Sequence, residues 1–145
     1  RKKYLLKLIK KLKFTNEPIQ KRYKHEELHD ALWMGDLYVH TSIVEIEAIS
    51  CLEAIACGMV PVIADSKKSA TRKFAIDNRC LYKSRSIKDL TAHIDYWIEH
   101  KEEKEKLSLE YQEFIKQFDF EECMNKMEQM LVEVKDNYQK VNQKK

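Results

Sequence analysis

The sequence predicts an α/β fold: a three-layer αβα domain with a short parallel sheet of about four strands and extra C-terminal helices. Apolar segments typical of strands alternate with segments of helical periodicity between residues 25 and 100. The chain also has only two glycines and two prolines among its 145 residues, which indicates short loops and much helix. Alternation of this kind is typical of a sheet that helices cover on both faces.

The first two helices and the first strand are predicted between residues 2 and 40. Residues 2–13 form an amphipathic pattern with lysines opposite an apolar face, which comprises Leu5, Leu8, Ile9 and Leu12. We expect this face to cover the sheet, and the alternative is a helix that lies on an anionic membrane surface. Residues 25–34 predict a second helix, and the run DLYVH at 36–40 predicts a strand.

The central elements follow from apolar runs and their stop signals. A helix is predicted from about Ile49 to Cys57, where Gly58 ends it. The run VPVIA at 60–64 predicts a buried strand that tolerates proline at its start, and RCLY at 79–82 predicts a weaker strand.

The C-terminal third is predicted to be helical. Ser86 can cap a helix over residues 86–100, whose buried stripe comprises Leu90, Ile94, Trp97 and Ile98. Two charged helices follow, and the last has a broad apolar stripe that we interpret as a docking surface: Phe120, Cys123, Met124, Met127, Met130, Leu131 and Val134. We expect one domain over residues 1–134 and a polar, frayed tail over 135–145.

Composition excludes several classes of protein. A net charge of +3 does not argue for nucleic acid, and 43% hydrophobic residues suffice for a core. No apolar run is long enough to span a membrane. The four cysteines form no C-x-x-C pair, which favours reduced thiols in a cytoplasmic protein.

Two glutamates stand where a parallel sheet binds ligands, beyond the carboxyl end of a strand. Glu45 falls in the loop after the strand DLYVH, and Glu53 falls about one turn into the next helix. The free N–H groups at the start of that helix suit a phosphate, and carboxylates on either side suit sugar hydroxyls. The alternative is that Ser50-x-x-Glu53 and Ser42-x-x-Glu45 form capping boxes.

This region resembles a known family. The spacing Glu45-x7-Glu53, followed by EAIACGMVPVIA at 53–64, resembles the donor motif of retaining glycosyltransferases with the two-domain GT-B fold. The segment EELHDALWMGDLYVHTS at 26–42 is similar to the helix and strand before that motif. The variant at 45–77 is most similar to bacterial diacylglycerol and cholesterol glucosyltransferases. The resemblance covers roughly residues 1–134 and implies a partial Rossmann-like, C-terminal donor-binding domain.

The resemblance also implies a role for each donor-binding position and no acid/base pair. It implies contacts with the donor sugar, with the distal phosphate through backbone N–H groups, and with the ribose hydroxyls. The sugar-binding residues would be Glu45, Ile46, Glu47 and Ala48, the phosphate-binding residues Ile49 and Ser50, and the ribose-binding residue Glu53. The commoner family motif has glycines near positions 46 and 48, and the loop IQKRYK at 19–24 lacks a glycine that the family often has.

The implied activity is transfer of a hexose from a nucleoside-diphosphate sugar, UDP-glucose above all, to a lipid or another hydroxyl acceptor, without a metal or other cofactor. In the family, a basic phosphate clamp and an acceptor-binding domain lie upstream. We therefore expect these residues to be inactive alone, and we assign no catalytic residue to them. We also expect either self-association through residues 119–134 of the last helix or fraying of that helix. A lipid acceptor would also favour contact with the inner face of the membrane.

Three other patterns remain as alternatives. The run HEELH at 25–29 matches the zinc-protease pattern, with His25 and His29 as ligands and Glu26 as base. A third zinc ligand would come from His40, Glu45 or Glu47. The run SKKSATRKF at 66–74 either adds positive charge at the ligand edge or is an ordinary basic loop. A non-catalytic interaction domain on a glycosyltransferase scaffold is the further alternative for the whole chain.

Overall fold

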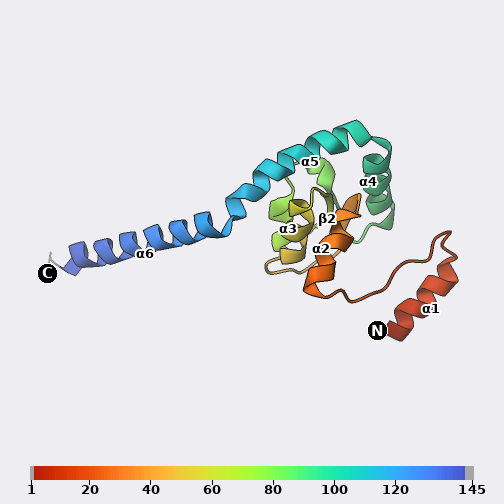
Figure 1. Ribbon diagram of the computed structural model, residues 1–145, viewed down its shortest axis with the longest axis horizontal. Coiled ribbons are helices and arrows are strands. Elements are labelled where there is room, and N and C mark those ends of the chain that lie inside the picture. The colour runs from red at the N-terminus through yellow and green to blue at the C-terminus, as the bar shows by residue number, and fades with distance from the viewer. Residues whose placement is uncertain (1, 143–145) are drawn as a thin grey trace.

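The computed structural model describes residues 2–142, apart from the side chains of His25, Val141 and Asn142, and Figure 1 shows the arrangement of its elements. The α-helices are α1 (Lys2–Leu12), α2 (His25–Trp33), α3 (Ile49–Ala56), α4 (Ile87–Glu99), α5 (Lys101–Ile115) and α6 (Phe120–Asn142). The strands are β1 (Leu37–His40), β2 (Val60–Asp65) and β3 (Leu81–Lys83). Short 3-10 helices are η1 (Ala70–Phe74), η2 (Asn78–Cys80) and η3 (Lys116–Phe118).

The sheet is parallel, with the strand order β1-β2-β3. Val39 pairs with Val62, and Ile63 pairs with Leu81, so the carboxyl ends of the three strands lie at one edge. The first two strands occur where they were predicted, and β3 begins two residues later than predicted because Arg79 and Cys80 belong to η2. The sequence predicted about four strands, whereas the described residues form a sheet of three.

Helices cover both faces of β2, as the sequence predicted. Residues 60–64 are buried without alternation, which requires cover on both faces. The helix α3 packs on β1 and β2, α4 packs on β2 and β3, and the two helices lie on either side of β2 (Figure 1). The largest fully buried side chains are Trp97 of α4 and Tyr111 of α5.

The helix α5 crosses the edge of the sheet where β1 and β2 begin. Lys104 Nζ lies 3.3 Å from Asp36 Oδ1, just before β1. Ser108 Oγ donates a hydrogen bond of 2.6 Å to the carbonyl of Gly58, just before β2. This edge is therefore occupied by a helix, and the opposite, carboxyl edge is left for loops.

The position of α1 corrects one prediction. Its apolar face was expected to cover the sheet, but no residue of α1 is buried, and Figure 1 shows the helix apart from the sheet. Leu5 is 42% exposed and Leu12 is 55% exposed. The periodicity predicted the helix correctly but not its packing, because an apolar face does not specify which surface covers it.

The helix α6 extends away from the domain (Figure 1). It continues to Asn142, whereas the sequence predicted fraying after about Asp136. The residues after Asp136 include Gln139 and Lys140, which are good helix formers even when exposed. None of the helices in the described part of the chain is long and apolar enough to span a membrane.

Candidate functional site at the carboxyl edge of the sheet

The loop that carries Glu45 is held against the loop after β2. The N–H of Ala70 donates 2.9 Å to the carbonyl of Glu45, and Glu45 forms an isolated parallel bridge with Ser69. The hydroxyl of Ser66 donates 2.6 Å to the carbonyl of Ile43. The half-buried Glu45 side chain accepts a bond of 3.0 Å from the N–H of Ile46. Glu45 is thus fixed at the carboxyl edge of the sheet, where the sequence placed it.

The N-terminus of α3 faces this loop with free donors. Ala48 is the N-cap residue, and its carbonyl accepts bonds from the N–H groups of Cys51 and Leu52. Within the described residues, the N–H groups of Ile49 and Ser50 have no hydrogen-bond partner, and both residues are exposed. These free donors and the positive end of the helix dipole make an anion-binding position at α3.

Neither predicted capping box forms. The N-cap of α3 is Ala48 in the left-handed conformation, so Ser50 already lies inside the helix. Its hydroxyl lies 2.9 Å from the hydroxyl of Tyr38. The other proposed box fails because the carboxylate of Glu45 bonds the N–H of Ile46 rather than reaching back to Ser42.

Glu53 lies on α3, half-buried, at an open hollow of about 720 Å³. Over residues 2–142, no hydrogen bond or ion pair is found for its carboxylate. The hollow is also lined by apolar side chains of α3, η3 and α6, which include Leu52, Phe118 and Phe120. The charged side chains of Lys116, Asp119 and Glu122 also line this hollow. The carboxylate of Glu53 therefore lies at a hollow of mixed character, with unused acceptors that are open to a ligand.

Tyr38 lies within electrostatic reach of both glutamates. Burial raises the pKa of its hydroxyl, and the hydrogen bond with Ser50 opposes this rise. The negative charges of Glu45 and Glu53 raise the pKa further. The structure therefore brings both predicted glutamates to the region around the Tyr38 hydroxyl and the start of α3.

Sequence reasoning missed two residues of this site, Tyr38 and His40. Both point to the same face of β1 because they are two residues apart in a strand. Tyr38 Oη lies 3.1 Å from Nδ1 of His40, whose pKa is lowered by burial, although Glu45 opposes this. Polar residues at alternate positions up to the end of a predicted strand were the available signal.

Positive charge gathers beside the loop of Glu45. Lys67, Arg72 and Lys73 line a hollow of about 430 Å³ after β2. Arg72 Nε lies 2.5 Å from Asp65 Oδ1. The run SKKSATRKF thus places basic side chains at this edge, a placement that fits both an ordinary basic loop and a loop that adds charge to the ligand edge.

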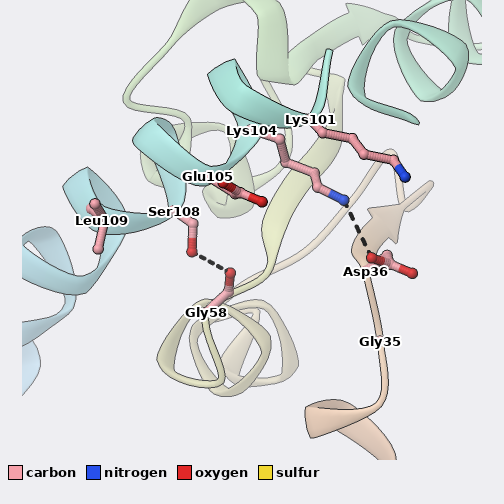
Figure 2. A pocket seen from close by; sticks show the side chains of 8 residues that line it. All are labelled: Gly35, Asp36, Gly58, Lys101, Lys104, Glu105, Ser108 and Leu109. Atoms are coloured by element: carbon pink, nitrogen blue, oxygen red, sulfur yellow. Dashed lines mark hydrogen bonds and ion pairs between the residues drawn. The ribbon is translucent and has the colours of Figure 1, made fainter. Parts of the chain in front are cut away.

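A second large hollow, of about 660 Å³, lies at the opposite edge of the sheet. Figure 2 shows that Gly35 and Asp36 line one side and a face of α5 lines the other, with Lys104 directed at Asp36. Its contacts serve the packing of α5 against the sheet. The predicted donor-binding residues do not line it.

The side chain of His25, one proposed zinc ligand of the pattern HEELH, lies outside the described part of the structure. Among the side chains that are described, no group of His, Cys, Asp and Glu is arranged to hold a metal ion. The helix α2 begins at His25, so the pattern occupies the first turns of a short helix. The carboxylate of Glu27 pairs with Lys21 at 3.0 Å. Two of the possible third ligands have other partners, since His40 bonds Tyr38 and Glu45 bonds the N–H of Ile46.

The four cysteines are free thiols, as predicted. Burial raises the pKa of Cys51 to about 12 and that of Cys80 to about 11. Neither thiol is ionised near neutral pH, so neither is a nucleophile of the site.

Comparisons with known proteins agree with this geometry. The family model "Glycosyl transferases group 1" matches residues 1–113. Among solved structures, the catalytic domain of cholesterol-alpha-glucosyltransferase from Helicobacter pylori is similar to this chain, with 42% sequence identity and a TM-score of 0.75. The match covers 81% of this chain and 73% of that chain. A search of curated proteins finds no match.

Proposed function

Because the chain belongs to the group 1 glycosyltransferases, with the GT-B fold and close similarity to a cholesterol glucosyltransferase, we propose that its carboxyl edge binds the donor of a retaining hexosyltransferase. The donor is a nucleoside-diphosphate sugar, with UDP-glucose the first choice. One observation carries this proposal: the first turn of α3 has free N–H groups, and its Ser50 bonds Tyr38, whose pKa the carboxylates of Glu45 and Glu53 both raise.

Each part of the donor has a matching group. The distal phosphate accepts hydrogen bonds from the N–H groups of Ile49 and Ser50, which lack protein partners over residues 2–142. Glu45 accepts from the sugar hydroxyls, and the exposed backbone at residues 46–48 lines the sugar. Glu53 accepts from the ribose hydroxyls, because a diol provides two donors for one carboxylate.

We propose that the rest of the enzyme supplies the acceptor and a basic phosphate clamp through a second domain outside these residues. The acceptor is a lipid or another molecule with a hydroxyl group, by analogy with the cholesterol glucosyltransferase. The departing phosphate of the donor takes the proton of the acceptor hydroxyl, and no metal or cofactor takes part. The helix α1 is basic and exposes leucines, which supports contact with a membrane surface. We propose that the enzyme is cytoplasmic and makes this contact at the inner face of the membrane.

Substitution Glu53→Gln tests the donor site. It keeps the shape of the side chain but removes the charge, so we expect UDP-glucose binding to weaken by roughly 1.5–3 kcal/mol, the range for hydrogen bonds to a charged group. Isothermal titration of UDP-glucose into the full-length enzyme measures the change. The matched control is Glu105→Gln, at the opposite edge of the sheet, which should leave the affinity unchanged. Equal affinities of wild type and Glu53→Gln would contradict the ribose role.

A further inference from the structure

A chain of hydrogen bonds runs from the end of β1 to the first turn of α3. His40 Nδ1 lies 3.1 Å from Tyr38 Oη, and Tyr38 Oη lies 2.9 Å from Ser50 Oγ. The Tyr38 and His40 rings are stacked, with centroids 6.0 Å apart and planes at 29°. Stacking and hydrogen bonding together hold the Tyr38 hydroxyl beside the position proposed for the phosphate.

The other ring nitrogen of His40, Nε2, determines which atoms donate along this series of hydrogen bonds. His40 is only 8% exposed, and its Nε2 is buried without a hydrogen-bond partner in the described structure. A proton on Nε2 would be a buried donor without an acceptor, which is rare in native proteins. A second proton would place a charge in the same buried site. This burial favours a neutral imidazole with its one proton on Nδ1, because Nε2 is then an unpaired acceptor rather than an unpaired donor.

The hydrogen bonds are then donated in one direction, from His40 toward Ser50. With a proton on Nδ1, His40 donates to Tyr38 Oη, and Tyr38 then donates its own proton to Ser50 Oγ. The Ser50 hydroxyl keeps its proton for a third partner. That hydroxyl is exposed in the first turn of α3, beside the free N–H groups of Ile49 and Ser50.

We infer that His40 and Tyr38 are positioning residues that orient the Ser50 hydroxyl as a side-chain donor to the distal phosphate of the bound donor. This inference rests on the proposed function and adds three side chains to it. A phosphate oxygen only accepts hydrogen bonds, so it suits a chain in which every hydroxyl donates toward it. Bonds in such a chain also strengthen one another through polarisation.

The first test measures the tautomer of His40. A long-range proton–nitrogen correlation spectrum of the enzyme, with nitrogen-15 in its histidines, distinguishes a proton on Nδ1 from a proton on Nε2. We expect the Nδ1–H form without ligand and with UDP bound. A proton on Nε2 in the UDP complex would overturn the inference, because Tyr38 would then have to donate to His40 instead of Ser50.

The second test compares ligands with and without phosphate. Ser50→Ala should weaken UDP binding about 10-fold, and Tyr38→Phe should weaken it by a similar factor, because either change removes the oriented hydroxyl. Uridine lacks phosphate, and its affinity should stay the same in both variants. The double variant should lose no more than Ser50→Ala alone, because both changes act through one bond. The matched control is Tyr138→Phe, on the exposed part of α6.

The third comparison separates orientation from packing at His40. His40→Asn keeps an N–H near the place of Nδ1, whereas His40→Leu keeps bulk and loses the donor. We expect UDP affinity near wild type in His40→Asn and a loss like that of Tyr38→Phe in His40→Leu. Equal losses for UDP and uridine in Ser50→Ala and Tyr38→Phe would show a structural role only and overturn the inference.

The outcomes also separate this inference from the proposed function. If Glu53→Gln weakens UDP-glucose binding but Ser50→Ala leaves UDP affinity unchanged, the donor site stands and the oriented hydroxyl fails. If the enzyme binds neither UDP nor UDP-glucose, the proposed function itself fails.

Discussion

Two residues in the left-handed region of backbone conformation bound the helix that carries Glu53. Ala48, at its N-cap, has φ 56°, and Gly58, just past its C-terminus, has φ 84°. Glycine reaches this region without strain, whereas a residue with a Cβ pays about 1–2 kcal/mol. Ala48 adopts this strained conformation at a position where related donor motifs commonly have glycine. Its buried methyl group packs in the core.

The first prediction concerns this pair. Gly58→Ala should destabilise the domain by about 1 kcal/mol, because left-handed strain exceeds the entropy that alanine removes from the unfolded chain. A new Cβ would lie 3.6 Å from Ser108 Oγ, so space is not the cause. Urea unfolding measures the free energy of unfolding. The contrasting variant is Ala48→Gly, which relieves strain but loses a buried methyl worth about 0.8 kcal/mol, so its stability should change little. A Gly58→Ala variant more stable than wild type would contradict the argument.

At the scale of elements, one arginine ties η2 to α4 and α5. Arg79 Nη2 lies 2.6 Å from Asp77 Oδ2, and Nη1 donates 2.8 Å to Tyr96 Oη and also bonds Glu103 of α5. Its guanidinium lies 5.1 Å from the ring centroid of the buried Trp97. The Arg79 carbonyl also accepts a hydrogen bond of 3.2 Å from Trp97 Nε1. These contacts hold the backbone in place just before β3 begins.

The second prediction is a pH dependence of this junction. The hydrogen bond from Arg79 lowers the pKa of Asp77 below its ordinary 3.8. A lowered carboxyl pKa stabilises the fold above the unfolded value, and that stabilisation is lost as the pH falls from about 3.8 through the folded pKa. Arg79→Gln should therefore cost about 1 kcal/mol at pH 7, given the exposure of the pair, and less at pH 3.

Urea unfolding at several pH values between 3 and 7 tests this expectation. The control is Arg22→Gln, an exposed arginine far from the junction along the chain, whose effect should be small and independent of pH. A cost of Arg79→Gln that is the same at pH 3 and pH 7 would show that the ion pair with Asp77 adds nothing to stability.

The third prediction concerns α2 and metal. Enzyme purified without chelator should contain no stoichiometric zinc, because a protease-like site needs a third ligand and two of the three candidates, His40 and Glu45, already have other partners. Elemental analysis by mass spectrometry measures the zinc content, with His25→Ala and His29→Ala as comparison variants. One tightly bound zinc per chain that both substitutions remove would overturn this expectation.

At the scale of the whole molecule, the two terminal helices project from the αβα domain (Figure 1). The stripe of α6 is open to solvent, with Phe120 75% exposed and Leu131 57% exposed. Apolar helix faces of this kind usually mark contacts with another surface. The docking interpretation from the sequence therefore agrees with the exposure of the stripe, while the partner stays a proposal.

The fourth prediction is that this chain alone self-associates through residues 119–134. Sedimentation velocity should show an average mass that rises with concentration, and Met127→Glu with Leu131→Glu should abolish the rise. Asn125→Glu with Gln129→Glu adds the same charge on another face of α6 and should leave association intact. A strict monomer in which hydrogen exchange finds α6 fully protected would contradict this prediction.

The sequence by itself determined the elements that depend on local pattern. The apolar run at β2 and the stop at Gly58 predicted a sheet strand and a helix end, and the structure contains both. Both were confirmed because strand burial and helix termination depend on a few neighbours along the chain. The Glu45-x7-Glu53 spacing predicted two carboxylates at one site, and their role there stays a prediction.

Only the tertiary structure decided what those elements touch. Tyr38 bonds Ser50, which is 12 residues away in the sequence, and Arg79 bonds Glu103, which is 24 residues away. Neither contact can be predicted from the periodicity of the sequence. The leucine face of α1 predicted a helix correctly and its packing wrongly, for the same reason. An amphipathic pattern states that a face needs cover, whereas the partner depends on which surfaces the folded chain brings within reach.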